Sequence, residues 1–581
     1  MKSDRTTQRL TLHVALALGL AMPTALVRAQ AATPAELVVR SGAIYTVQGA
    51  KPWAQAFAVR NGRYIAVGSD SDMARHIGPK TQVIDLKGAM AMPGINDVHA
   101  HPLSGAYEDL FACNMAQSDD LEKVLERVAA CAKRAAPGGW IVGGGWSSRL
   151  LGQIASSTSL EALDKASAGH PTVLRDETYH NRWVSSDVLQ RANISAQSAD
   201  PPNGSYVKDA VTGQPVGLLK EFPAFAEVQK LIPPRTADQM RQTVEAASRT
   251  LNGYGITGVQ DAASSEQSLR LWSQADRSKA LSLRVVASVS MLEPEQTGDR
   301  NGMALVGARG SYRTANVRPD FAKLFLDGVP PARTSSFIEP YLPDHEHGSD
   351  FRGRTTYTFA QLVEMLAVLD KQGVAAKMHA TGDASLHQAL DAVEAVRKRN
   401  GPKGPRHQIA HASFIADSDL PRFRKLNVTA DLSPMLWFPT GLNIATAMAI
   451  GEIRAKRIFP IKSLVTAGAL VAGGSDWPAG QPTANPWIGI EGMVTRKNPL
   501  GEIPGVLGPD QAVDLATAVR IYTINSAQAM GLARETGSIE PGKSADFIVL
   551  DRDVFKVPVE QIHLTQVQRT FFQGRLVHSA P

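Results

Sequence analysis

Cysteine is nearly absent from this chain, because its 581 residues contain only Cys113 and Cys131. Two thiols without histidines nearby do not make a zinc finger, and neither lies in a context that marks a catalytic nucleophile. In an oxidising compartment the pair could form one disulfide closing a loop of about 18 residues, a stabilisation of roughly 3 kcal/mol. The alternative is two buried thiols, and the sequence leaves both open.

Two hydrolase motifs are missing as well. The chain contains no Gly-x-Ser-x-Gly elbow of the kind that presents a nucleophilic serine. It also contains no His-Glu-x-x-His pattern, the helical zinc motif of many metalloproteases. A serine hydrolase or a protease of that zinc class is therefore excluded as the first interpretation.

Positive charge is in only slight excess, because 61 Lys and Arg residues against 55 Asp and Glu residues give a net charge of +6. The first 31 residues hold four basic side chains and one acidic side chain, so the remaining chain carries about +3. The densest basic run left, residues 397–399, is typical of the solvated end of a helix. Nucleic acid is therefore excluded as a partner.

Long hydrophobic runs are missing after the N-terminus. Residues 10–27 are mostly apolar, follow a basic stretch and precede Ala29-Gln30-Ala31, which is the pattern of a secretory signal with its cleavage site. We expect residues 1–31 to be removed and the protein to be secreted, with the periplasm as its compartment. The alternative is an uncleaved anchor helix. No later run approaches the roughly 18 apolar residues that span a membrane, so we expect no stable membrane anchor after cleavage.

The most informative feature that is present is a pair of histidines, His99 and His101, at the end of a strand-like stretch. Residues two apart on a strand point to the same face, so both imidazoles can reach one metal ion. A His-x-His pair alone is weak, and a chance surface pair is the alternative.

Several further stretches, in order along nearly the whole chain, resemble the amidohydrolase superfamily of metal-dependent hydrolases, and within it the YtcJ-like (amidohydrolase 3) branch. They are residues 92–101 (MPGINDVHAH), 140–146, 174–183, 323–328, 379–384, 473–478 and 537–550. The resemblance implies a (β/α)8 TIM-like barrel with its metal site at the carboxyl ends of the strands.

The spacing of the chain agrees with an α/β barrel. Helices alternate with apolar strands, as in residues 358–372, where Phe359, Leu362, Leu366 and Leu369 form one apolar stripe before the strand ending at His379. A βα unit takes roughly 30 residues, and His379 and His411 are about one unit apart. Between His99 and Lys323, however, about 130 residues exceed the three units expected there. A large insertion after strand 1 is therefore predicted.

These considerations divide the chain into four predicted parts. Residues 1–31 form the signal, and residues 93–530 form the barrel, with an inserted lobe at about 140–250. Short strands with an Asn61-Gly62 hairpin turn precede the barrel, and similar strands follow it. Residues 32–92 and 531–581 are therefore predicted to form one small composite β-sandwich from both chain ends.

The candidate metal ligands lie at predicted strand ends, where barrel active sites form. Imidazoles and carboxylates suit Zn²⁺ or a similar divalent cation, and we expect one or two ions. Asp476 has a second expected role, because a carboxylate beside metal-activated water can take a proton and deliver it to a leaving amine. The predicted ligands are His99, His101, Lys323, His379, His411 and Asp476.

Lys323 needs a chemical change to be a ligand, because an ammonium group repels a dication. The resemblance implies that this lysine reacts with CO₂ to give N6-carboxylysine, a carboxylate that bridges two metal ions. The alternative is an ion pair between Lys323 and an acidic neighbour such as Asp320, which leaves a site with one metal ion held by His99, His101, His379 and Asp476.

Three residues are candidates for contact with the substrate. His180 resembles a histidine that, in the family, lies on the inserted lobe near the substrate. It is therefore a candidate for substrate contact and for a catalytic role. The alternative is that it only forms a hydrogen bond within the lobe. Trp146 is a second candidate, although buried packing is the commoner role of tryptophan. Arg333 could bind an anionic substrate group, and a surface salt bridge is its alternative.

The sequence therefore predicts a secreted metal-dependent hydrolase that cleaves a non-peptide C–N bond, an amide or formamide, in a small molecule. Two rival functions stay open. One is hydrolysis of another bond, such as an ester, a carbamate or a cyclic amide or amidine, because a barrel does not fix its reaction. The other is a binding or regulatory barrel without catalysis. A homodimer is a possible assembly.

Overall fold

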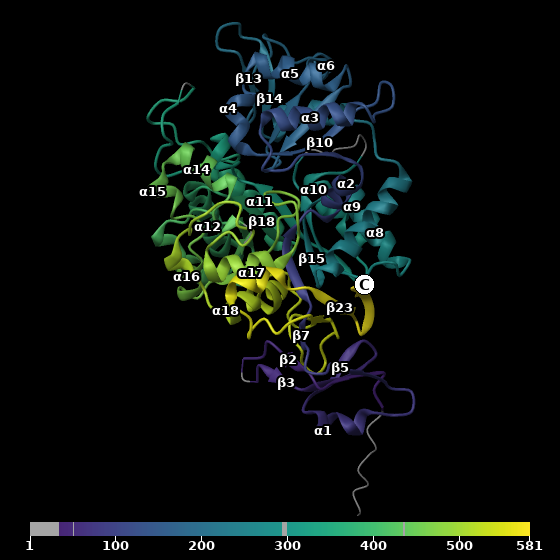
Figure 1. The fold of residues 1–581 in the computed structure, drawn as a ribbon. Coiled ribbons are helices and arrows are strands. Elements are labelled where there is room, and N and C mark those ends of the chain that lie inside the picture. The colour runs from purple at the N-terminus through teal and green to yellow at the C-terminus, as the bar shows by residue number, and fades with distance from the viewer. Residues whose placement is uncertain (1–33, 50, 293–298, 345, 434–435) are drawn as a thin grey trace, which may run out of the picture.

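The computed structural model describes residues 34–581 except 50, 293–298, 345 and 434–435. The predicted signal, residues 1–31, lies outside the described residues. Three parts follow one another along the molecule in Figure 1: a β-sandwich at one end, a barrel in the middle and an α/β lobe at the other end. This is the predicted fold class.

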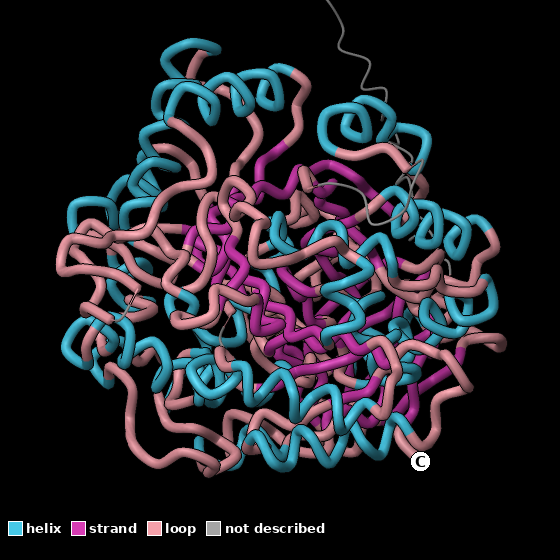
Figure 2. Tube along the Cα trace, turned by 90° about the horizontal axis from the view of Figure 1, so that it is seen from above, coloured by secondary structure: helices cyan, strands magenta, loops and turns pink. Residues whose placement is uncertain are grey.

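Eight parallel strands form the barrel sheet, and Figure 2 shows strands at the centre of the molecule with helices around them. The first and last strands also meet, since the N–H of Asp476 donates to the carbonyl oxygen of His99 at 2.6 Å. In order of pairing, the strands are β8 (Ile95–Ala100), β15 (Ile256–Ser264), β16 (Arg284–Ser290), β17 (Val317–Phe325), β18 (Ala375–Ala380), β19 (Gln408–His411), β20 (Thr429–Leu432) and β21 (Leu470–Gly473).

The helices between these strands bury their apolar faces against the sheet. In α11 (Phe359–Lys371), Thr358 caps the first turn, and Leu362, Leu366 and Leu369 are buried as predicted. Phe359 is 48% exposed, so the apolar face begins one turn later than the sequence indicated. The other main helices are α2 (Pro102–Phe111), α8 (Ala237–Gly253), α9 (Glu266–Arg277), α10 (Gly302–Ala308), α12 (Asp383–Asn400), α13 (Leu420–Lys425), α14 (Gly441–Ile450), α16 (Ile461–Thr466), α17 (Pro486–Thr495) and α18 (Leu515–Arg520).

Both chain ends build the β-sandwich, as predicted. In its second sheet, β22 (Phe547–Leu550) pairs antiparallel with β7 (Met90–Pro93), which leads directly into barrel strand β8. Phe57 and Phe547 contact each other edge to face inside the sandwich, with ring centroids 4.8 Å apart. The first sheet contains β5 (Arg63–Gly68), β4 (Ala56–Arg60), β1 (Leu37–Arg40) and β6 (Gln82–Asp85), and the second adds β24 (Arg575–Ser579), β23 (Val567–Phe572), β2 (Ala43–Tyr45) and β3 (Trp53–Ala54).

The insertion after strand β8 is a lobe with its own sheet and core. The strands of the lobe begin at Cys113, earlier than the predicted start near residue 140. Helix α8 falls inside the predicted range of the lobe, but it packs on barrel helix α2 and so belongs to the barrel. A disulfide joins Cys113 to Cys131. The strands are β9 (Cys113–Asn114), β10 (Ile141–Trp146), β11 (Thr172–Asp176), β12 (Asn181–Val184), β13 (Ser205–Lys208) and β14 (Pro215–Lys220), and the main helices are α3 (Leu121–Ala132), α5 (Ser157–Ser167), α6 (Ser186–Arg191) and α7 (Phe222–Leu231).

One segment of the sandwich has the residue spacing of a P-loop without its structure. Gly537, Gly542, Lys543 and Ser544 fit the glycine-lysine-serine pattern that cradles phosphates. A P-loop must open a helix, but here strand β22 follows. The Lys543 ammonium also donates to Ser538 Oγ at 2.6 Å. The segment is therefore a structural turn.

Within the described residues, no helix has both the length and the apolar character required to cross a membrane.

Candidate active site

Six side chains gather at the carboxyl ends of the barrel strands, the end at which barrel enzymes place their active sites. The structure thus brings together all six residues that the sequence singled out as ligands. They are His99 in β8, His101 directly after it, Lys323 in β17, His379 in β18, His411 at the end of β19 and Asp476 three residues after β21.

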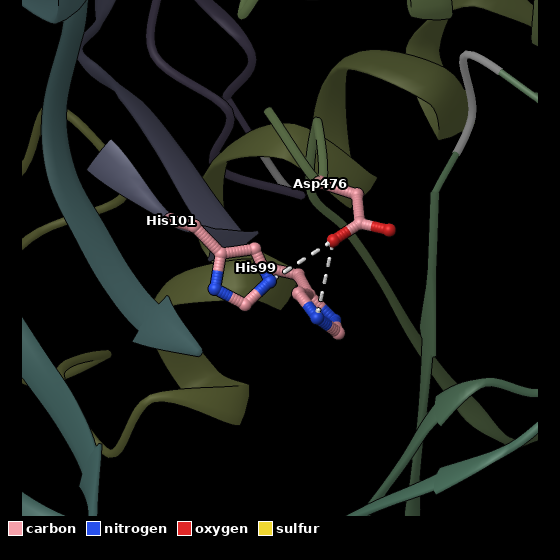
Figure 3. A group of neighbouring side chains, drawn as sticks. All are labelled: His99, His101 and Asp476. Atoms are coloured by element: carbon pink, nitrogen blue, oxygen red, sulfur yellow. Dashed lines mark ion pairs between the residues drawn. The ribbon is translucent and has the colours of Figure 1, made fainter. Parts of the chain in front are cut away.

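The tightest group, called the metal-type cluster below, consists of His99, His101 and Asp476. The Asp476 Oδ1 atom lies 3.4 Å from Nε2 of His99 and 3.4 Å from Nε2 of His101, as the dashed lines in Figure 3 show. One ligand atom from each residue lies within 4.8 Å of the other two. His99 is fully buried, whereas the His101 side chain is 23% exposed and lines a cavity. One small cation can therefore contact all three side chains.

Backbone contacts fix where the Asp476 carboxylate lies. Asp476 adopts a left-handed conformation with φ of 60°, which is unusual for a residue other than glycine. The neighbouring Ser475 N–H donates to both carboxylate oxygens of Asp97, at 3.1 and 3.2 Å, and the His99 N–H donates to the same carboxylate at 3.0 Å. Asp97 thus joins the first and last strands of the barrel beneath the metal-type cluster.

Lys323 lies against this cluster with an unusual protonation preference. Its Nζ atom is 3.2 Å from Nε2 of His99, and the side chain is 1% exposed. Burial, helped by the charge of nearby Lys377, lowers the pKa of Lys323 to about 7. The sequence left open an ion pair between Lys323 and Asp320. That alternative is wrong, because Asp320 forms an ion pair with Arg313 instead. A substantial share of Lys323 is therefore the neutral amine near neutral pH, the form that reacts with CO₂.

His379 and His411 complete one wall of the cluster. Their ring centroids are 4.5 Å apart, and His411 Nδ1 lies 3.7 Å from Asp476 Oδ2. His379 places Nε2 3.0 Å from the carbonyl oxygen of Gly328. Burial lowers the pKa of both histidines well below the usual value. Both rings are therefore neutral near pH 7, as a metal-binding imidazole must be.

The sequence analysis missed two buried charged residues behind His99. Asp431 in β20 places Oδ2 2.9 Å from Nδ1 of His99, and the same oxygen accepts a hydrogen bond from the Lys377 ammonium. Lys377 also donates to the carbonyl oxygen of Val98 at 3.1 Å. All three side chains are fully buried. The only sequence signal for Asp431 and Lys377 is a charged residue inside an otherwise apolar strand. Their partners come from other strands, so the sequence does not show which residues they contact.

His180 reaches the site from the lobe and is held there by Glu221. The His180 Nδ1 atom lies 2.7 Å from Glu221 Oε2, and Thr334 of the barrel donates a hydrogen bond to the other oxygen of Glu221 at 2.5 Å. The His180 ring centroid is 5.0 Å from that of His379. Burial opposes protonation of His180, but the Glu221 carboxylate outweighs it and raises the pKa. Both roles left open by the sequence are thus compatible with the structure.

A cavity of about 980 Å³ opens beside these residues, between the barrel and the lobe. Among its lining residues are His101, Lys323, His379, His411 and Asp476, together with His180. Aromatic side chains cover part of its wall, including Phe222, Phe225 and Phe325. This volume matches that of pockets for small molecules.

Two of the predicted substrate contacts are wrong. Trp146 is fully buried in the core of the lobe, where its indole N–H donates to the carbonyl oxygen of Leu174 at 3.3 Å. Arg333 lies outside the cavity lining and pairs with Asp344 at 2.6 Å. Tryptophan is the largest apolar side chain and fills the lobe core, while the Arg333 guanidinium is neutralised by a carboxylate eleven positions along the chain.

The barrel, and the metal-type cluster at the carboxyl ends of its strands, define a metal-dependent hydrolase. A family model described as the amidohydrolase family matches residues 82–578. The chain therefore belongs to the amidohydrolase family, and it is an enzyme that acts on carbon–nitrogen bonds.

Two relatives agree with this assignment, and a solved structure shares the fold. The chain is 27% identical to N-substituted formamide deformylase from Arthrobacter pascens, covering 93% of this chain and 98% of the relative. It is also 27% identical to the putative amidohydrolase YtcJ from Bacillus subtilis (strain 168), covering 92% and 98%. An uncharacterized metal-dependent hydrolase from Pyrococcus horikoshii OT3 has the same fold, with a TM-score of 0.68, 24% identity and coverage of 90% and 99%.

Proposed function

We propose that this enzyme hydrolyses an amide or formamide bond in a small, non-peptide molecule bound in the cavity beside Asp476. The observation that carries the proposal is the approach of the Asp476 carboxylate to the imidazoles of His99 and His101, which lie two positions apart at the end of β8. Such a group combines a cation site with a carboxylate able to carry a proton. The likeness to a formamide deformylase supports an acyl group as small as formyl.

The cluster fits a divalent cation chemically. Because Nδ1 of His99 is directed at Asp431, its Nε2 presents a lone pair toward Asp476 Oδ1 at 3.4 Å. Two electron-rich atoms that face each other are stabilised by a cation between them. His99, His101 and Asp476 would hold it, and their N and O donors suit Zn²⁺ or a similar ion. When bound, this ion polarises the scissile carbonyl and acidifies the attacking water.

Asp476 would move the proton that hydrolysis requires. Its carboxylate accepts the proton of the attacking water and then donates it to the nitrogen of the leaving amine, as in general acid–base catalysis. The distance of 3.7 Å between Asp476 Oδ2 and His411 Nδ1 places a neutral imidazole at the second oxygen. An expelled amine without that proton would be a very poor leaving group.

His180 would contact the substrate from the lobe. Glu221 occupies its Nδ1, so Nε2 is the nitrogen left for the substrate carbonyl. The raised pKa of His180 favours the form that donates from both nitrogens. His180 is therefore a hydrogen-bond donor to the acyl oxygen and the second candidate for proton transfer.

Lys323 would carry the carboxylate that allows a second cation to bind. Its buried amine has a pKa of about 7, and the carboxylates that favour its charged form are those of Asp476 and Asp431. Reaction with CO₂ turns it into an oxygen ligand beside His379 and His411. Without that reaction, the enzyme would use one cation.

A periplasmic location is part of the proposal. The disulfide between Cys113 and Cys131 supports it, because such bonds persist in oxidising compartments.

The test is a panel of matched substrates: N-substituted formamides, the corresponding acetamides, formate esters and carbamates, and a cyclic amidine. Formate or acetate release and amine release are measured with the metal-loaded enzyme and after chelation. We expect chelator-sensitive release of amine from formamides or acetamides. Selective turnover of esters, carbamates or amidines would show that the enzyme cleaves one of those bonds instead of an amide. No turnover by enzyme with a full metal complement would favour a binding barrel without catalysis.

A further inference from the structure

A row of three phenylalanine rings leads away from the metal-type cluster along the cavity wall. Phe325 begins the row, with its ring centroid 4.9 Å from Lys323 Nζ and 5.4 Å from the His379 ring. Phe222 follows at 4.9 Å from Phe325, and Phe225 follows at 5.4 Å from Phe222. All three rings line the same cavity as Asp476. The wall therefore offers apolar contact to a substrate part that extends away from the reacting bond.

Arg182 lies at the far end of this row. Its guanidinium carbon sits 4.1 Å above the Phe225 ring, and the residue lines the cavity. Its Nη1 donates to the carbonyl oxygens of Tyr179 and Asn181, at 3.0 Å each. Across the described residues, nothing accepts a hydrogen bond from its Nε or Nη2. These two nitrogens form the edge of the guanidinium that binds a carboxylate through two parallel bonds.

The acidic residues near Arg182 are occupied by other donors. Glu108 accepts hydrogen bonds from Arg175 and from the Tyr179 hydroxyl. Asp176 accepts hydrogen bonds from the backbone and the side chain of Asn181, at 3.0 and 2.8 Å. Burial lowers the pKa of Arg182 to about 10, in keeping with a guanidinium that is desolvated without a carboxylate in direct contact. An arginine kept in this state at a cavity wall is suited to a ligand.

We propose that Arg182 binds a carboxylate at the distal end of the substrate, whose apolar middle lies along Phe325, Phe222 and Phe225. The inference rests on the proposed function, because it places the reacting amide beside Asp476. It assigns the substrate class as an amide with an extended apolar substituent that ends in an anionic group. Arg182 thus takes the role that the sequence suggested for Arg333.

Position along the chain supports this assignment. Arg182 is two residues after His180, so both project from neighbouring positions of one segment of the lobe toward the same cavity. One segment would then contact the substrate at its acyl group and at its distal carboxylate. A substrate too short to reach Arg182 would lose the second contact.

A competing arginine provides a matched control. Arg235 lines the same cavity and also stacks on an aromatic ring, with its guanidinium carbon 3.9 Å from the Tyr107 centroid. It differs from Arg182 in that it does not flank the phenylalanine row. The two arginines can therefore be exchanged one at a time for glutamine and compared.

The experiment uses ω-formamido carboxylates of increasing chain length and N-alkylformamides of the same lengths. Formate release by the metal-loaded enzyme gives kcat/KM for each pair. At the best length, we expect the carboxylate to be favoured by roughly tenfold or more, the scale of a charge-assisted pair that is lost with one partner. Arg182→Gln should abolish this preference, measured as the ratio of kcat/KM within each pair, Arg182→Lys should keep part of it, and Arg235→Gln should leave it intact.

Three outcomes would overturn the assignment of Arg182: no preference for the carboxylate at any length, a preference that persists in Arg182→Gln, or one lost in Arg235→Gln. Turnover of neutral formamides by each variant shows that it is folded. If no formamide is hydrolysed, the proposed reaction fails, and calorimetric binding of the same carboxylates still tests Arg182. Equal Kd values for wild type and Arg182→Gln would then reject it.

Discussion

Nδ1 of His99 lies 2.9 Å from Oδ2 of Asp431, and both side chains are fully buried. This contact fixes the imidazole so that Nε2 faces Asp476. His99 lies in β8 and Asp431 in β20, and only β21 lies between these two strands in the closed barrel. The orientation of the first candidate ligand is thus set by a residue that does not face the cavity.

Asp431→Asn should weaken metal binding without removing any of the proposed ligands. The amide keeps the size of the carboxylate but loses the charge that orients His99 and neutralises Lys377. Loss of a carboxylate behind a metal-binding histidine typically costs 10- to 100-fold in metal affinity or activity. The measurement is metal Kd and kcat/KM, and Asp419→Asn is the control, since Asp419 is buried against Nδ1 of His387. Equal effects of the two variants would contradict this role for Asp431.

Asp476→Asn should separate metal binding from proton transfer. The amide still offers one oxygen to a cation but cannot accept a proton from water near neutral pH. General acid–base transfer contributes roughly 10²- to 10⁴-fold, so kcat should fall at least about a hundredfold while KM changes far less. The variant is assayed with its metal content measured in parallel. Near-normal kcat at full metal content would show that Asp476 is not the proton carrier, and His180 would then be the next candidate.

Lys323→Ala should lose one metal equivalent and most activity if the lysine is carboxylated. The buried amine of the wild type is the reactive form near its pKa of about 7. Added bicarbonate should therefore raise the activity of CO₂-depleted apo-enzyme during metal reconstitution, and it should have no effect on the variant. Two metal ions retained by Lys323→Ala would refute the bridging role.

Glu177→Gln tests the electrostatics where the lobe meets the barrel. Burial raises the pKa of Glu177 to about 7, above the unfolded value of about 4.3. The stability from its neutral form is therefore complete below about pH 4.3 and lost as pH rises through about 7. Relative to wild type, the free energy of unfolding of the variant should rise between pH 4.5 and 8, by at most about 3 kcal/mol. Denaturant unfolding measures it, with the exposed Glu161→Gln as control, and a constant difference would contradict the shift.

Strand positions were the part of this structure most open to prediction from sequence. Spacing of about 30 residues per unit placed His379 and His411 at the ends of neighbouring strands and Asp476 two strands after His411, as the structure has them, because a barrel repeats one unit along the chain. The composite sandwich was also predictable, since its strands alternate and carry a hairpin signal at Asn61. Both features are local patterns that the fold then repeats or pairs.

Contacts between distant segments were not predictable in the same way. Asp431 and Lys377 gave no sign of meeting His99, because a charged residue within a strand does not reveal its partner. Trp146 and Arg333 were misassigned for the same reason: their surroundings depend on the lobe core and on Asp344. Arg182, which lines the cavity, lies in a stretch that resembles the family but carries no local mark of an anion site.

The most direct test of the central claim compares wild type with His99→Ala and His101→Ala, measuring bound metal and release of amine from N-substituted formamides. His387→Ala is the control, because its side chain is 47% exposed and lies outside the cavity lining. We predict that each of the two site variants loses bound metal and turnover together, while the control keeps both. Activity close to wild type in either His99→Ala or His101→Ala would contradict the account.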